Sequence, residues 1–152
     1  MALFALLGVT GYWMLFTTLP AYDDEGYILI SAREQSRTGG LYNAVYSQYG
    51  PAFYVLTDAI QGVLGKPFTH HGARWLTLAL WLGTAGACTA LVHRLTGRRS
   101  LALFTAACTF LYLYFIPDEP FHPGTLIIFL LASVVYAHAI ASDTGAWQRA
   151  GW

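Results

Sequence analysis

The chain has 152 residues, of which 56% are hydrophobic and only 11% are charged, and its formal net charge is zero. Soluble domains carry about 25% charged residues, so this composition is too poor in charge to cover a water-facing surface. A balanced charge gives no electrostatic basis for binding nucleic acid, and the sequence has neither a Gly-rich phosphate loop nor a zinc-ligand spacing. The composition therefore predicts an integral membrane protein with no nucleic-acid partner.

The apolar residues gather in four blocks that almost exclude charge. A helix of about 17–25 apolar residues is long enough to cross the hydrocarbon core of a bilayer. The blocks cover residues 2–19, 73–92, 101–116 and 124–141. The first block has no basic segment before it and a poor cleavage site near Pro20, so we interpret it as an uncleaved helix rather than a signal peptide. We predict an all-α, polytopic helix bundle of about four spans that forms a single membrane domain over residues 1–152.

The basic residues predict which ends of the helices face the cytoplasm. Arg94, Arg98 and Arg99 lie between the second and third blocks, and Arg149 follows the fourth. The opposite side carries four basic and seven acidic residues. Because cytoplasmic loops are enriched in Lys and Arg, both termini are expected in the cytoplasm, with the protein in a bacterial inner (plasma) membrane. Residues 20–72 then form an outer loop.

The outer loop is expected to contain two short helices that lie at the membrane surface. One follows the acidic run at residues 23–25 and ends at Gly39-Gly40. The other runs from Ala52 to about Leu64 after Pro51, which is a residue that often begins a helix. This second stretch is apolar but too short to cross the bilayer, so we interpret both as amphipathic juxtamembrane helices.

Two acidic clusters are predicted to face the outer side. Asp23, Asp24 and Glu25 follow the first span, and Asp118 with Glu119 separates the third span from the fourth. A carboxylate at a membrane surface can deprotonate an acceptor hydroxyl, and a pair of carboxylates can hold a divalent cation against a departing phosphate. The alternatives are helix capping for the first cluster and a solvated turn for the second. The sequence itself requires no cofactor.

Basic residues on the same side can pair with a lipid-linked phosphate. Arg33, Lys66 and Arg74 all lie near the predicted membrane surface, where a phosphate needs a charged partner. The alternative for Lys66 and Arg74 is anchoring, with the charged heads reaching the headgroup region. A metal site at His70-His71 is disfavoured because adjacent side chains on a helix point in different directions.

An ordered set of short motifs resembles the N-terminal part of polytopic glycosyltransferases of the GT-C class. Relatives in this class include the protein O-mannosyltransferases and the aminoarabinose transferases that modify lipid A. The matching motifs, in chain order, are Asp24-Glu25-Gly26, Ala32-Arg33-Glu34, Gly39-Gly40-Leu41-Tyr42, Tyr49-Gly50-Pro51-Ala52-Phe53-Tyr54, Leu64-Gly65 and Ala73-Arg74. Members of the class are several times longer, so the chain is expected to be the N-terminal portion of a longer fold.

The resemblance implies a transferase that takes its sugar from a polyprenyl-phosphate donor on the non-cytoplasmic face. It implies Asp24 as the base, Glu25 or Asp23 in support, and Asp118 with Glu119 as a second acidic pair. Arg74 would contact the donor phosphate or serve as a structural anchor. The partners would be a lipid-linked sugar and membrane lipids. The alternative is a non-catalytic membrane component, either an accessory subunit or a protein resembling a transporter of lipid-linked sugars.

Overall fold

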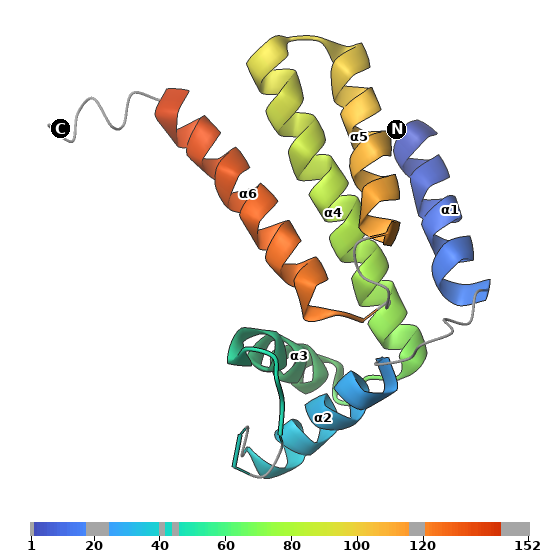
Figure 1. Ribbon diagram of the computed structural model, residues 1–152, viewed down its shortest axis with the longest axis vertical. Coiled ribbons are helices and arrows are strands. Elements are labelled where there is room, and N and C mark those ends of the chain that lie inside the picture. The colour runs from blue at the N-terminus through green and yellow to red at the C-terminus, as the bar shows by residue number, and fades with distance from the viewer. Residues whose placement is uncertain (1, 18–24, 40–41, 44–45, 116–120, 144–152) are drawn as a thin grey trace, which may run out of the picture.

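The computed structural model describes residues 2–17, 25–39, 42–43, 46–115 and 121–143, which contain six helices and no strand. The helices are α1 (Ala2–Thr17), α2 (Glu25–Thr38), α3 (Pro51–Leu64), α4 (His70–Thr96), α5 (Arg99–Phe115) and α6 (Pro123–Asp143). In Figure 1, α1, α4, α5 and α6 run alongside one another, and α2 and α3 form a pair at one end of this bundle. The described structure is therefore all-helical, as predicted.

Two helices are long and apolar enough to cross a membrane. They are α4, with 27 residues, and α6, with 21. The apolar helices α1 and α5 have 16 and 17 described residues, which is less than the roughly 20 that a transmembrane helix needs. The structure thus supports two candidate spans, and a bundle of four spans stays a prediction.

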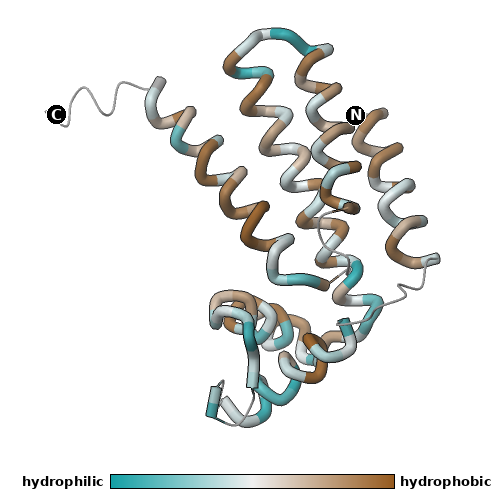
Figure 2. The backbone as a smooth tube through the Cα atoms, in the orientation of Figure 1, coloured by the Kyte–Doolittle hydropathy of each residue, from teal (hydrophilic) through white to brown (hydrophobic). Residues whose placement is uncertain are grey.

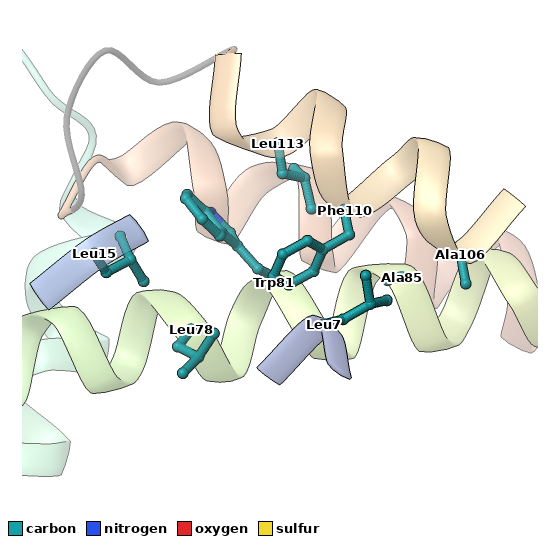
Figure 3. Packing of buried hydrophobic residues seen from close by; sticks show 8 residues of the cluster. All are labelled: Leu7, Leu15, Leu78, Trp81, Ala85, Ala106, Phe110 and Leu113. Carbon is teal, nitrogen blue, oxygen red and sulfur yellow. The ribbon is translucent and has the colours of Figure 1, made fainter. Parts of the chain in front are cut away.

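Helix α4 is the centre of the bundle and contacts α1, α5 and α6. The buried cluster in Figure 3 gathers around Trp81 of α4. The Trp81 ring meets Phe110 of α5 edge-on, with the ring centroids 5.8 Å apart. Leu7 and Leu15 of α1 complete the cluster from the other side. This core holds α1 and α5 against α4.

Glycines allow the closest helix contacts, which is typical of helices that associate without a hydrophobic driving force. A Cβ atom on Gly11 of α1 would lie 2.6 Å from side-chain atoms of both Leu78 and Phe110. A Cβ atom on Gly83 of α4 would lie 2.7 Å from the Phe129 ring of α6. A larger residue at either position would force the neighbouring side chains of Leu78, Phe110 or Phe129 to shift.

Apolar residues recur along all four bundle helices (Figure 2), and many of the large ones are exposed. On α6, the exposed large side chains are Ile127, Leu130, Leu131, Val134, Val135 and Ile140. Similar side chains are exposed on α1 and α5, including Trp13 and Phe104. A contiguous apolar surface of this kind marks a region that another apolar phase covers.

The helix ends extend beyond the apolar blocks where polar residues continue the helix. The second block is predicted to begin at residue 73, but α4 begins at His70, because the Thr69 hydroxyl caps it by accepting from the Gly72 N–H. The same helix continues to Thr96, where the left-handed Gly97 caps it, and does not end at residue 92. Hydropathy identifies the apolar part of a helix and omits such polar turns.

Aromatic rings pack the α2–α3 pair against the bundle. Phe121, just before α6, packs against Phe53 of α3 and against Phe68, with ring centroids 5.0 and 5.7 Å apart. The Gln61 amide oxygen accepts from the Phe68 N–H at 3.0 Å. These contacts place α3 beside the beginnings of α4 and α6.

Tyr54 of α3 makes the stability of the α2–α3 pair depend on pH in the alkaline range. Its side chain is buried, and its hydroxyl lies 2.7 Å from the Ser47 hydroxyl. Burial raises the pKa of Tyr54 above its usual 10.0, against the opposing effect of the Ser47 hydrogen bond. The folded state therefore holds this proton more tightly than the unfolded state. The stability from this group is complete below about pH 10 and is lost as pH rises through the higher folded pKa.

We expect Tyr54→Phe to lower the free energy of unfolding by about 1 kcal/mol at pH 8, because the Ser47 hydroxyl loses one of its two hydrogen-bond partners. The variant should also lose less stability than the wild type between pH 9.5 and 11.5. Reversible SDS unfolding, followed by circular dichroism across this range, measures both effects. Parallel pH curves for the two proteins would contradict this account of Tyr54.

Candidate functional site

Glu25 and Arg74 form a buried ion pair at the junction of α1, α2 and α4. The Arg74 Nη2 atom lies 3.0 Å from Oε2 of Glu25, and the Nε atom lies 3.2 and 3.3 Å from the two carboxylate oxygens. The Glu25 side chain is 1% exposed and that of Arg74 is 14% exposed. The bidentate geometry and the burial make this a strong, directional contact.

Both residues of the ion pair make further contacts, with α1 and with the first turn of α4. The Arg74 Nη1 atom donates to the Leu15 carbonyl at 2.7 Å, and His70 Nδ1 lies 3.3 Å from Oε1 of Glu25. One guanidinium therefore holds both the last turn of α1 and the first residue of α2.

Four of the predicted acidic residues, Asp23, Asp24, Asp118 and Glu119, lie outside the described residues. The helices that flank them are described. The end of α1, the beginning of α2, the end of α5 and the beginning of α6 all lie toward the same end of the bundle in Figure 1. The positions of the four acidic residues themselves stay a prediction.

Arg33 and Lys66 lie apart from Arg74 and line a shared pocket of about 450 Å³ between α2 and α3. Arg33 donates to the Phe68 carbonyl from Nε at 3.2 Å and from Nη2 at 2.8 Å. Arg37 and Asp58 also line the pocket. Three cations and one carboxylate make it a basic pocket, which suits an anionic ligand.

Polar contacts arrange one wall of this basic pocket. The Ser36 hydroxyl donates to Asp58 Oδ1 at 2.6 Å and accepts from Gln61 Nε2 at 2.8 Å. Arg37 forms an exposed ion pair with Glu34 at 2.9 Å. Asp58 is therefore hydrogen-bonded within the wall, while Lys66 makes no polar contact among the described side chains and can meet a ligand.

Sequence reasoning missed an aromatic cluster where the end of α1 packs against the beginning of α4. Tyr12 stacks on Phe16 with centroids 4.6 Å apart, and Trp75 lies 5.2 Å from Phe16. His71 packs on Phe16 at 5.6 Å, whereas His70 faces Glu25, so the two adjacent imidazoles have different neighbours. Aromatic rings at a helix end are typical of the bilayer interface, and that signal was present in the sequence.

Within the described ranges, no group of three His, Cys, Asp or Glu side chains is arranged to hold a metal ion. Comparisons of the chain with protein-family models, curated proteins and solved structures found no match. The resemblance to GT-C glycosyltransferases therefore rests on the residues quoted for it.

Proposed function

We propose that this chain is an integral membrane glycosyltransferase, or the N-terminal portion of one, that transfers a sugar from a polyprenyl-phosphate donor on the non-cytoplasmic face. The observation that carries the proposal is the gathering of helix ends beside the α2–α3 pair. The ends of α1 and α5 and the beginnings of α2 and α6 lie toward that end of the bundle (Figure 1), and the Arg74 guanidinium contacts both α1 and α2. Carboxylates delivered to one membrane surface are what such a transfer requires.

The proposal places all four bundle helices in the membrane. α1 and α5 are short, but both pack along α4, and both expose large apolar side chains that lipid would cover. The Arg residues between α4 and α5 would face the cytoplasm, and the α2–α3 pair would lie at the outer surface. Val55, Val63 and Leu64 are exposed on α3, as expected for a helix that rests on lipid.

In this mechanism Asp24 acts as the general base. It removes the proton from the acceptor hydroxyl as that oxygen bonds to the anomeric carbon, and the bond from that carbon to the phosphate oxygen breaks. The departing polyprenyl phosphate takes the electron pair. Asp23 supports the base, and Asp118 with Glu119 would hold a divalent cation that neutralises the leaving phosphate.

Glu25 and Arg74 have a positioning role in the proposal. The Glu25 carboxylate is 1% exposed and is bonded to Arg74, so it cannot reach an acceptor. The buried Glu25 is instead held in place by Arg74, and Glu25 directly follows Asp24 in the chain. Arg33 and Lys66, at the basic pocket, become the better candidates for contact with the donor phosphate.

The test uses the protein expressed from its complete gene and reconstituted in nanodiscs with a lipid extract of its own host. That extract supplies the native polyprenyl-phosphate sugars and the lipid acceptors. We expect mass spectrometry to show loss of the sugar-bearing lipid and a matching gain of free polyprenyl phosphate. If the sugar-bearing lipids are unchanged relative to empty nanodiscs, with the acceptors present, the transferase proposal is wrong.

One observation favours the alternative of a non-catalytic membrane component. Glu25, Arg33 and Arg74 are all engaged with partners inside the chain. An accessory subunit, or a carrier of lipid-linked sugars, needs such residues only for structure. This alternative predicts that the protein retains the sugar-bearing lipid through purification and releases no polyprenyl phosphate from it.

A further inference from the structure

An open groove lies between α1, α4 and α5 at the end of the bundle opposite the α2–α3 pair. Its volume is about 470 Å³, which falls within the roughly 300–1,000 Å³ typical of small-molecule sites. It is lined by the small residues Gly86, Ala90 and Ala102, here called the floor, and by the larger residues Phe4 and Leu103. The walls are thus almost wholly apolar, and the small residues create the space.

The groove is not required by helix packing. A Cβ atom on Gly86 would meet only Phe4, at an ordinary 3.9 Å, whereas one on Gly11 would clash at 2.6 Å. Gly11 is needed for the contact of α1 with α4, but Gly86 leaves room that no described side chain fills.

The rim of the groove, defined by Arg99 and His93, carries the positive charge of Arg99. Arg99 and His93 line it, both are exposed, and neither side chain has a polar or ionic partner among the described residues. Arg98 lies next to Arg99, outside the groove. The sequence has no Asp or Glu before residue 23 or between residues 59 and 117, so the three groove helices carry no acidic residue. Nothing in those helices neutralises the rim.

We propose that this groove binds an anionic phospholipid, with one acyl chain along its apolar walls and the phosphate at Arg99 and His93. A free phosphate would gain nothing from the apolar walls, and a neutral lipid would gain less from the rim. Basic pockets between helices on the cytoplasmic side are known to hold anionic headgroups. The proposal requires membrane insertion but does not depend on sugar transfer, so the two can fail separately.

The experiment titrates the full-length protein in a mild detergent and measures lipid binding by native mass spectrometry. The probes are phosphatidylglycerol, phosphatidylcholine with the same acyl chains, and glycerol 1-phosphate as a headgroup without chains. The variants are Arg99→Gln, which removes the rim charge, and Gly86→Leu, which fills the floor. Arg98→Gln is the matched control, because it removes the same charge outside the groove. Circular dichroism checks that each variant keeps its helices.

We expect phosphatidylglycerol to bind at least about tenfold more tightly than phosphatidylcholine, and glycerol 1-phosphate to bind more weakly than either. Arg99→Gln and Gly86→Leu should each weaken phosphatidylglycerol binding by about tenfold, and Arg98→Gln by less than threefold. Equal affinity for the two phospholipids would overturn the proposal. Equal effects of Arg99→Gln and Arg98→Gln would also overturn it, as would glycerol 1-phosphate binding as tightly as phosphatidylglycerol. If Gly86→Leu fails to fold, Arg99→Gln alone still tests the proposal.

Discussion

Asp24→Asn is expected to reduce sugar transfer by at least about a hundredfold, because a general base contributes about 10²–10⁴ to a rate. Substitution by asparagine distinguishes a catalytic role of Asp24 from a role as a helix cap. Asn and Asp cap a helix equally well, so a residue that only caps the helix beginning at Glu25 should tolerate this change. The measurement is the release of polyprenyl phosphate in nanodiscs, at equal amounts of folded protein.

Glu34→Gln is the matched control for the loss of a carboxylate. Glu34 lies on α2 and forms an exposed ion pair with Arg37, so its removal should leave transfer within about twofold of the wild type. An Asp24→Asn variant that transfers sugar at the wild-type rate would show that Asp24 has no catalytic role and that its cluster serves as a cap.

Glu25→Gln is expected to lower the free energy of unfolding by about 3–5 kcal/mol. The substitution leaves Arg74 with its charge while its side chain is only 14% exposed, and an uncompensated buried charge is costly. The loss should appear as a shift of the reversible SDS unfolding midpoint in micelles. In contrast, Glu34→Gln breaks an exposed pair and should cost less than about 1 kcal/mol.

A double-mutant cycle isolates the ion pair from other effects of each substitution. The variant Glu25→Gln/Arg74→Met removes both charges, so it should recover at least half of the stability that Glu25→Gln loses. Full recovery is not expected, because the Leu15 carbonyl also loses its donor. If the two single losses simply add, the pair does not join α2 to α4 in the way that its geometry indicates.

The helices could be predicted because their signals are local. Blocks of apolar residues indicated the bundle, and the run from Asp23 to Gly40 indicated α2. Pro51 and Gly65 indicated the two ends of α3. In the structure Pro51 lies in the first turn of this helix, and Gly65, with a left-handed backbone, follows its last turn. Each of these signals depends on residues within a turn or two of one another.

The partners of Glu25 and Arg74 could not be predicted in the same way. Forty-nine positions separate the two residues in sequence, and each had a local interpretation that was complete without the other. Glu25 fitted a helix cap or a base, and Arg74 fitted a phosphate contact or an anchor. Only the return of α4 past the beginning of α2 brings them together. The basic pocket also depends on the packing of α2 against α3.

Cysteine labelling tests the membrane arrangement that the proposed function requires. Cys88 and Cys108 are first replaced by alanine, and single cysteines are then introduced as Asp24→Cys, Asp118→Cys or Arg98→Cys. A membrane-impermeant maleimide is applied to intact cells and to lysed cells. The account predicts labelling of positions 24 and 118 in intact cells and of position 98 only after lysis. Labelling of positions 24 and 118 from opposite sides of the membrane would contradict it.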